Sequence, residues 1–550
     1  MRVAVARLGT SSFRLFNEAE PGALHSSDNM VILLAPAPPG TPPAHGESMT
    51  VPEQPPPIHR LDRSAVLQAT LQAGLIGLPA LLIGLLALRQ PLLAGAASAA
   101  ALFAALLFQM GARLPAYALG LLGVSLAGYA FLGKGYAYLG VPPLFIGEVA
   151  LGLGLIGLVM AWARGARLVH TRGLVLLIAL FILIGLGSTL PYVGKYGLNA
   201  IRDAAAWYYA LFTLIVATLV VHLGRFRQVI LRYGRVLPYF LLAAPFGFWI
   251  TRLFEPSIPT WPISAQAILL VKGGDLAVHL AGVMAFLMLG LHRLAAPEHA
   301  QSARPLRRRT EWWWWGLWMI SFASLLTGRA SLVTVGAALA CVLLLRPISR
   351  WGRPLFLAAS MLLLLVVVDP RIKMSSGREL SLDGLLLNVQ SITGDTGVSV
   401  VDGTRTWRLD WWRTITRYTV YGDKFWTGKG YGINLANSDG FQVDSEQTLR
   451  NPHSIHYSIL ARSGVPGLVS WIALNLVFAW SLLMAFFRAR TAGHLVWANV
   501  HLWILAYWVA LMTNASFDVF IEGPQGGIWY WSLLGFGIAA LELYRRGEKV

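Results

Sequence analysis

One polar stretch between two apolar runs carries the side chains best suited to chemistry. Residues 405–467 are rich in Gly, Arg and Trp and contain the run Asn451-Pro452-His453-Ser454. Asn is a good helix N-cap and Pro suits the first helical position, so the run predicts a helix that begins at Pro452 with His453 in its first turn. The positive end of a helix disfavours imidazolium, and a neutral imidazole can accept a proton near pH 7. His453 is therefore the first candidate for a general base.

The same pattern also fits a histidine that only caps or packs, and the local sequence leaves both interpretations open. His456 lies three residues further on, close to the same helix face. Two histidines at this spacing without a clear third ligand are a weak metal signal, so we predict no metal site. His456 is kept as a candidate substrate-binding residue. Ser463-Gly464 is expected to end this short helix before the next membrane span.

Arginine is the second theme of the stretch. A predicted amphipathic helix, TWRLDWWRTITRY, carries Arg408 and Arg413, and Arg405 directly precedes it. Guanidinium forks suit bidentate binding of phosphate, and aromatic faces such as that of Trp411 suit sugars or lipid headgroups. Each arginine could equally be a snorkelling or salt-bridged residue.

Other ionisable residues lie near the ends of apolar runs. Arg329, in Leu-Thr-Gly-Arg-Ala-Ser, is expected at the outer junction of two spans, where a charge is costly unless it is paired, snorkels or binds a ligand. Arg202-Asp203 favours a structural ion pair, with Arg202 kept as a candidate substrate-binding residue. Asp518 and Glu522 stand in the last outer loop, and nothing in the sequence ranks them.

Composition defines the class of protein that must position these residues. The chain has 550 residues, of which 56% are hydrophobic and only 13% charged, against about 25% charged residues in soluble domains. The formal charge of +18 comes with Lys and Arg collected in loops on one side of the apolar runs, which favours membrane orientation over nucleic-acid binding. The single cysteine, Cys341, excludes an intrachain disulfide and a Cys-based metal cluster.

The apolar runs predict an all-α polytopic membrane protein with about 14 transmembrane helices, within a range of 12–14. The predicted spans are 66–88, 92–111, 115–133, 143–163, 173–191, 204–223, 236–252, 275–292, 313–328, 331–347, 354–369, 464–487, 495–514 and 526–544. Basic residues follow the even-numbered spans, which predicts that both termini are cytoplasmic.

The expected organisation has four parts. They are a disordered Pro-rich cytoplasmic tail at 1–62, transmembrane helices 1–11 at 63–369, a large outer-facing loop at 370–463 that carries the catalytic residues in the periplasm, and transmembrane helices 12–14 with a basic tail at 464–550. Chemistry in such a loop has no ATP, so its energy must arrive in an activated substrate carried across by lipid.

Short motifs resemble those of the O-antigen ligase and O-antigen polymerase family. The segment HSIHYSILARSGVPGL is similar to its C-terminal signature through His453, Ala461, Gly464 and Gly467, while Arg462 stands where the family usually has Glu. LTGRAS, WRLDWW and GKGYG, in this order along the chain, resemble three further segments of the family, and their order agrees with the family's. The resemblance covers about residues 140–540.

The resemblance implies a GT-C-like glycosyltransferase of the bacterial cytoplasmic (inner) membrane. The sequence has no obvious acidic metal cluster, so we predict no metal requirement and no cofactor. The donor would be a glycan on undecaprenyl diphosphate, and the acceptor a second glycan or lipid A-core. His453 would deprotonate the acceptor hydroxyl, and Arg329 and Arg408, with Arg405 as the alternative to Arg408, would hold the departing diphosphate. The competing hypothesis is a transporter or flippase for lipid-linked glycan. It fits the number of spans, but the sequence lacks an internal repeat and its polarity is concentrated in one outer loop.

Overall fold

The structure is a computed structural model of the chain. It describes residues 111–295, 304–323, 328–346, 399–443 and 445–550, together with Gln109 and scattered positions between 356 and 390. The chain divides into two compact units, 1–94 and 95–550, and all the described residues lie in the second. The predicted tail at 1–62 and the predicted spans at 66–88, 92–111 and 354–369 lie wholly or largely outside the described residues.

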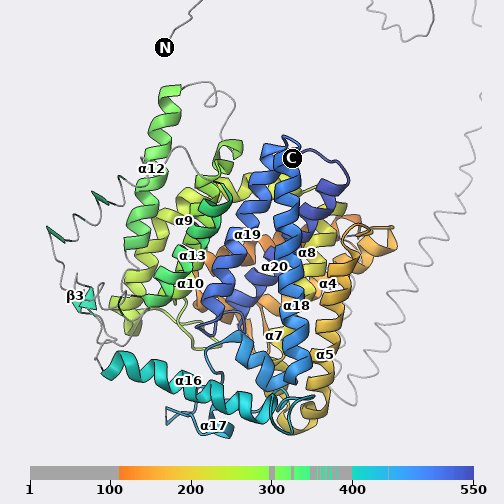
Figure 1. The fold of residues 1–550 in the computed structure, drawn as a ribbon, viewed down its shortest axis with the longest axis vertical. Coiled ribbons are helices and arrows are strands. Elements are labelled where there is room, and N and C mark those ends of the chain that lie inside the picture. Colours follow the sequence, from red (N-terminus) through yellow and green to blue (C-terminus); the bar gives the residue numbers. More distant parts are fainter. Residues whose placement is uncertain are drawn as a thin grey trace, which may run out of the picture. The chain divides into compact units, whose positions relative to one another are not determined.

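The described part of the chain is a polytopic bundle of α-helices (Figure 1). Seven helices within it are long and apolar enough to cross a membrane, or eight if one bent pair counts as a single span. The seven are α3 with the turn before it (Gly111–Leu132), α4 (Ile146–Ala163), α5 (Arg172–Tyr196), α9 with the turn after it (Phe226–Ser257), α18 (Ile455–Thr491), α19 (Leu495–Ala515) and α20 (Pro524–Arg545). The bent pair joins α6 (Leu198–Asp203) and α7 (Ala205–Tyr208) to α8 (Leu211–His222) at an angle of 45°. This confirms the all-α polytopic class, whereas the count of about fourteen spans and the GT-C-like architecture stay predictions.

Three further helices of the described part of the chain belong to the bundle. Two of them are shorter and apolar, namely α10 (Gly273–Met288) and α13 (Arg329–Leu345), and the third is α12 (Arg304–Ala323). The 3-10 turns η2 (Lys134–Tyr138) and η4 (Leu291–Ala295) and the short strand pairs β1–β2 (Gly140–Val141, Leu144–Phe145) and β3–β4 (Ile372–Lys373, Glu379–Leu380) lie in connections between the longer elements.

The core of the bundle is built around α19 and α20. α20 packs most extensively on α8, and α19 packs on α10, α13 and α18. Small residues permit this closeness: a Cβ at Gly535 would lie 2.7 Å from the backbone oxygen of Thr213 on α8. Helices in a membrane gain stability from such close backbone packing, because lipid offers no hydrophobic drive for their association.

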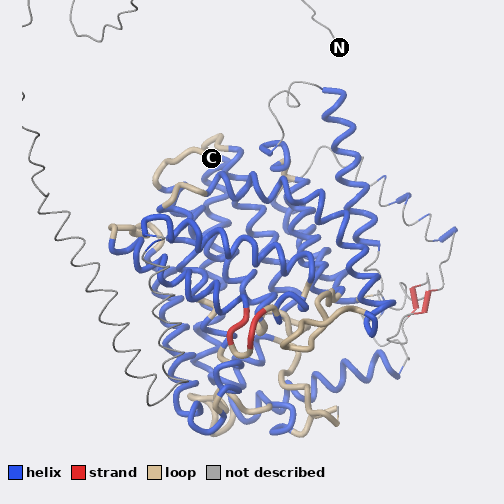
Figure 2. Tube along the Cα trace, turned by 180° about the vertical axis from the view of Figure 1, so that it is seen from behind, coloured by secondary structure: helices blue, strands red, loops and turns tan. Residues whose placement is uncertain are grey.

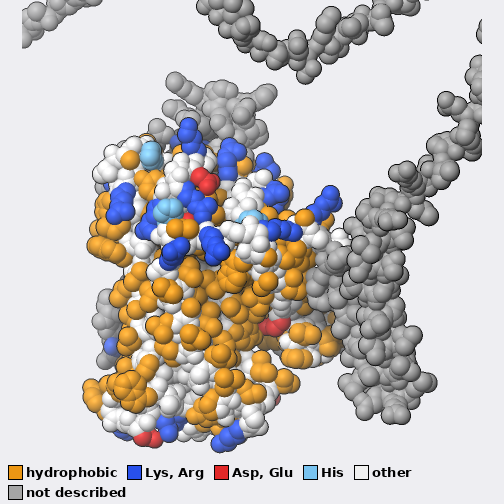
Figure 3. Space-filling view, turned by 90° about the vertical axis from the view of Figure 1, so that its right-hand side faces the viewer, with side chains coloured by type: hydrophobic (Ala, Val, Ile, Leu, Met, Phe, Trp, Pro, Cys, Tyr) orange, Lys and Arg blue, Asp and Glu red, His pale blue; other side chains and the backbone are white. Residues whose placement is uncertain are grey.

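The two ends of the bundle differ in chemistry. Figure 3 shows a broad hydrophobic band with Lys and Arg side chains gathered beyond one edge of it. At that end the α20 C-terminus is tied to the loop between α4 and α5, since Arg546 donates to the Arg167 carbonyl at 2.7 Å and Glu542 accepts from the backbone N–H of His170 at 2.9 Å.

The other end carries the helices of the polar stretch. α16 (Ser399–Thr419) and α17 (Leu435–Asp439) lie across the ends of the bundle helices, on the side away from the C-terminus (Figures 1 and 2). Trp411 and Ile415, one turn apart on α16, are fully buried. They form a small separate core with Leu435 of α17 and Leu460 of α18. This core fixes the amphipathic helix against the part of α18 that follows His453.

Candidate active site

The turn around His453 departs from the predicted helix start. α18 begins at Ile455, and His453 has φ +55°, so it is not in the first helical turn. The Asn451 side chain accepts a hydrogen bond from Arg462 Nη2 at 2.9 Å, which takes the oxygen that was expected to cap the helix. A tertiary contact has therefore overruled the local capping pattern. The predicted break at Ser463-Gly464 is confirmed, because Gly464 has non-helical φ 65° and ψ −166° inside α18.

A left-handed backbone at His453 is unusual for a residue with a side chain. Such a conformation costs on the order of 1–3 kcal/mol and persists only where its surroundings fix it. Here Trp412 donates its indole N–H to the Pro452 carbonyl at 2.8 Å. The Trp407 ring also meets the His453 ring edge-on, with centroids 6.2 Å apart. Two tryptophans of α16 thus hold the turn that presents the imidazole.

The imidazole of His453 faces a carboxylate. His453 Nδ1 lies 3.4 Å from Asp518 Oδ1, and each side chain is 27% exposed. Burial raises the pKa of the Asp518 carboxyl, but the hydrogen bond with His453 and the charge of Lys272 outweigh that effect and lower it to about 2. Asp518 is therefore ionised near neutral pH. In the neutral form of His453 it favours the tautomer with the proton on Nδ1, which leaves Nε2 as the acceptor atom. This is the arrangement that a general base needs.

Arg408 approaches the same loop from α16. Its Nη1 donates to the Phe517 carbonyl at 2.7 Å, one residue before Asp518. Arg405 is exposed one turn earlier on the helix. The structure therefore brings Arg408 and His453 to neighbouring residues of one loop.

Two other candidates on α16, Arg413 and Trp411, contact other side chains of the protein. Arg413 pairs with Asp410 at 2.8 Å on an exposed surface. Trp411 is fully buried, donates to Asp439 Oδ2 at 2.7 Å and stacks on Phe441. Its described contacts are those of a packing residue.

Arg329 is the first residue of α13. The opposite end of that helix is joined to the end of α18 by a hydrogen bond from Arg490 to the Leu345 carbonyl, at 2.8 Å. Because α13 packs along α10 and α19, Arg329 lies toward the end of the bundle where α19 leads into Asp518. The convergence of Arg329 with His453 stays a prediction.

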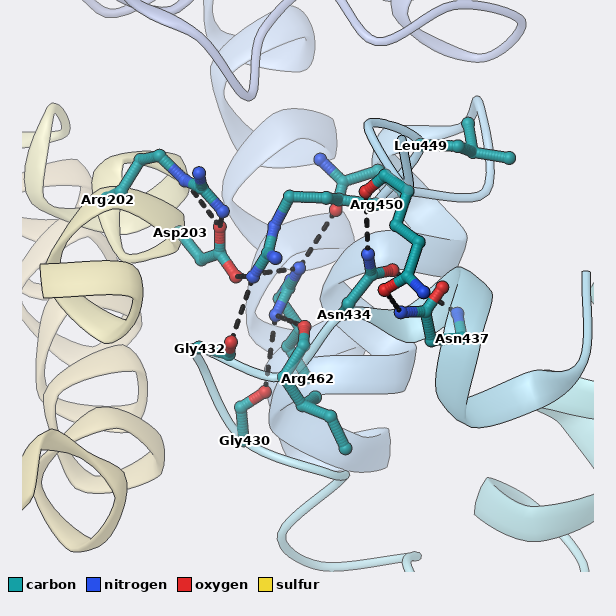
Figure 4. Close-up of polar contacts among 12 residues, drawn as sticks. Arg202, Asp203, Gly430, Gly432, Asn434, Asn437, Leu449, Arg450 and Arg462 are labelled. Carbon is teal, nitrogen blue, oxygen red and sulfur yellow. Dashed lines mark hydrogen bonds and ion pairs between the residues drawn. The ribbon is translucent and has the colours of Figure 1, made fainter. Parts of the chain in front are cut away.

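The predicted pair Arg202–Asp203 belongs to a larger cluster (Figure 4). Arg202 Nε lies 3.3 Å from Asp203 Oδ1, while Arg450 Nη2 and Arg462 Nη2 lie 2.8 Å and 3.2 Å from Oδ2. The carboxylate is buried, with 6% of the side chain exposed. Three guanidinium groups from α6, the loop before His453 and α18 thus meet on one acid.

His456 is engaged within the protein at both ring nitrogens. Trp471 donates its indole N–H to Nδ1 at 3.2 Å, and Nε2 lies 3.0 Å from the Ser516 hydroxyl. Since Nδ1 accepts, Nε2 carries the proton of the neutral ring and donates to Ser516. His456 therefore joins α18 to the loop that carries Asp518.

A second acid lies close by. Glu522 Oε1 accepts a hydrogen bond from the Ser458 hydroxyl at 2.5 Å. Burial raises the pKa of the Glu522 carboxyl to about 7, although the Ser458 hydrogen bond and the charge of Arg462 oppose the rise. No group of three His, Cys, Asp or Glu residues among those that the structure describes is arranged to hold a metal ion.

Sequence reasoning gave no rank to Asp518 and Glu522 and no role to Arg450. Their partners lie far along the chain, since His453 and Asp518 are separated by 65 positions and Asp203 and Arg450 by 247. Arg462, which departs from the motif that the segment resembles, was a usable signal for such a distant partner. A buried arginine requires an acid or several carbonyls around it.

The fold and the site together define a class: a multi-pass α-helical membrane protein with a histidine–carboxylate pair and arginines at one end of its bundle. Within that class, residues 314–472 match the family model described as O-antigen ligase. The match confirms the predicted resemblance to the O-antigen ligase and O-antigen polymerase family, and it supports an O-antigen ligase-type, glycosyl-transfer function in general terms. No curated protein matches the chain.

Proposed function

We propose that this protein is a membrane glycosyltransferase that moves a glycan from an undecaprenyl-diphosphate donor to an acceptor hydroxyl at the outer face of the bacterial cytoplasmic membrane. The observation that carries the proposal is the approach of His453 and Arg408 to consecutive residues of one loop, Asp518 and Phe517. A base beside a cation is what transfer from a diphosphate requires.

The chemistry follows from these positions. The acceptor oxygen attacks the anomeric carbon of the donor sugar and forms the new glycosidic bond, while the bond from that carbon to the diphosphate oxygen breaks with its electron pair. His453 Nε2 takes the proton of the acceptor hydroxyl, and Asp518 stabilises the resulting imidazolium. Arg408 and Arg329, with Arg405 as the alternative to Arg408, neutralise the charge that gathers on the departing diphosphate.

The basic end of the bundle supports the orientation of the site. Arg167, Arg545 and Arg546 lie together at the end opposite α16. Because basic residues mark the cytoplasmic side, this arrangement supports a periplasmic position for the site and a cytoplasmic position for the C-terminus. The substrate then reaches the enzyme already activated on its lipid.

The test is reconstitution of the full chain in nanodiscs with a glycan on undecaprenyl diphosphate. His453→Ala should reduce transfer by about 10²- to 10⁴-fold, the range for a general base. Lys424→Gln, at an exposed residue paired with Asp423, serves as the control and should leave transfer unchanged. A product that grows as a ladder would identify a polymerase, and a single transfer to lipid A-core would identify a ligase.

The same variant separates the enzyme from a transporter. In cells, His453→Ala should leave lipid-linked precursor on the outer face without transfer. Accumulation on the cytoplasmic face instead would favour the flippase hypothesis, and full activity of the variant in nanodiscs would exclude the proposed mechanism.

A further inference from the structure

The cluster on Asp203 holds more positive charge than its acid can balance. Arg202, Arg450 and Arg462 all contact the one carboxylate. The next acid, Glu522, directs its carboxyl to Ser458 instead. Asp203 carries one negative charge against the three positive charges of these guanidinium groups, so its ion pairs leave the cluster with excess positive charge. Such excess charge in a partly buried place is costly unless an anion joins it.

The three arginines differ in how fully the protein uses them. Arg462 is 3% exposed, and besides its contacts with Asp203 and Asn451 its Nη1 donates toward the carbonyls of Gly430 and Ile433, both at 3.4 Å. Both terminal nitrogens of Arg462 are therefore engaged within the protein, and its role is structural.

Arg202 and Arg450 each have hydrogen-bond donors that contact no partner among the described residues. The side chain of Arg202 is 55% exposed, and only its Nε and Nη2 are used, both on Asp203. Arg450 uses Nη2 alone, toward Asp203 and the Gly432 carbonyl. In Figure 4 their two guanidinium groups converge on Asp203 from different elements. Nη1 of each is without a hydrogen bond among the described residues.

The rim beside this pair has the chemistry of a sugar site. Tyr196 packs against Gly432, where a Cβ would lie 2.6 Å from the Tyr196 side chain, and Tyr192 stacks on Tyr196 with centroids 6.2 Å apart. Lys195 Nζ lies 5.1 Å from the centre of the Tyr196 ring. Arg450 donates to the carbonyl of the same Gly432, so cationic and aromatic side chains both adjoin this glycine. That combination is suited to binding a charged sugar.

We propose that Arg202 and Arg450 bind an anionic group, phosphate or carboxylate, carried by a sugar of the glycan acceptor. The proposal rests on the proposed transferase function, because the anionic group belongs to the acceptor of that reaction. Arg450 and His453 are three residues apart, so their Cα atoms are separated by at most about 11 Å. A sugar held at Arg450 could thus extend a hydroxyl to His453.

Electrostatics explains why a second cationic group is needed. The donor diphosphate, held by Arg408 at the loop that also contacts His453, would repel an anionic acceptor. Arg202 and Arg450 offset that repulsion and fix the acceptor by charge-assisted hydrogen bonds. An acceptor without the anionic group gains nothing from them.

The experiment compares a phosphorylated glycan acceptor with its dephosphorylated form, using the full chain in phosphatidylcholine nanodiscs. Arg202→Gln should raise the KM for the phosphorylated acceptor about 10-fold, as expected for loss of a charged hydrogen bond. It should leave kcat, and the KM for the dephosphorylated acceptor, unchanged. Arg450→Gln should act in the same direction, and Lys424→Gln, the matched loss of one outer charge, should change neither KM.

A binding measurement makes the result independent of turnover. Wild-type protein should bind glucose 6-phosphate at least 10-fold more tightly than glucose, and Arg202→Gln should remove that difference. If folded Arg202→Gln and Arg450→Gln variants have the wild-type KM for the phosphorylated acceptor, the proposal is overturned. His453→Ala tests the transferase function separately. A dependence on Arg202 seen only when phosphatidylglycerol is added would make a lipid headgroup the ligand and would also overturn it.

Discussion

Arg462 and Asp203 form a buried ion pair, with Arg462 Nη2 3.2 Å from Asp203 Oδ2. The same Nη2 donates to the Asn451 side chain, two residues before His453. One guanidinium therefore connects α6 to the turn that presents the imidazole. Arg462 stands where the motif that the segment resembles usually has Glu. Its acidic partner, Asp203, comes from another helix.

Asp203→Ala should destabilise the protein strongly, because it leaves three guanidinium groups around an empty place. Breaking a buried pair in this way costs about 3–5 kcal/mol. Unfolding in mixed micelles, followed by circular dichroism, measures the change. Asp410→Ala is the control, since its pair with Arg413 is exposed and contributes about 1 kcal/mol or less. Equal losses in the two variants would mean that the cluster does not hold the fold.

The sequence predicts the helices better than it predicts the site. Apolar runs follow local rules of length and composition, so the predicted span 173–191 reappears as α5, Arg172–Tyr196. The helix start at Pro452 was wrong because the partner of Asn451 is Arg462 rather than the local backbone. Local capping signals cannot report such a competitor.

The site itself was only half predictable. His453 and Arg408 follow from residue type, motif and the chemistry of phosphate. Asp518 does not, because its contact with His453 depends on how α19 packs against α18. A carboxylate 65 positions away in the sequence becomes a partner only once that packing is known.

Asp518→Asn should slow transfer without abolishing it. The amide keeps the shape but no longer stabilises an imidazolium on His453, so we expect kcat to fall about 10- to 100-fold, in line with the loss of a residue that orients a catalytic group. KM for the donor should change little, because Arg408 binds the Phe517 backbone and not this side chain. Steady-state kinetics in nanodiscs distinguishes the two parameters. A loss confined to KM would indicate that Asp518 binds substrate rather than orienting the base.

Glu522 should make folding stability depend on pH. Burial raises its pKa in the folded protein to about 7 from an ordinary value of 4.5, so the folded state holds the proton more tightly than the unfolded state. This contribution is fully present below about pH 4.5 and is lost as pH rises through 7, which lowers stability by roughly 1–3 kcal/mol once partial exposure is allowed for. Glu522→Gln should flatten the profile between pH 5 and pH 7.5. Unfolding midpoints at the two pH values provide the measurement, and the same slope in wild type and variant would refute the assignment.

Gly464→Ala should disrupt the break that separates the two parts of α18. Gly464 has φ 65°, and a Cβ there would lie 2.3 Å from the Phe425 carbonyl oxygen. The substitution therefore adds backbone strain to a clash with the loop after α16, and a loss of about 2 kcal/mol or more is expected. Gly187→Ala on α5 is the matched control, because nothing lies within 4 Å of its Cβ position. Because Val465 N–H donates to the same Phe425 carbonyl at 2.8 Å, Gly464→Ala should also loosen residues 425–430, which hydrogen exchange of their amides can detect. Unchanged exchange there, with stability equal to that of Gly187→Ala, would show that the break is not held by this contact.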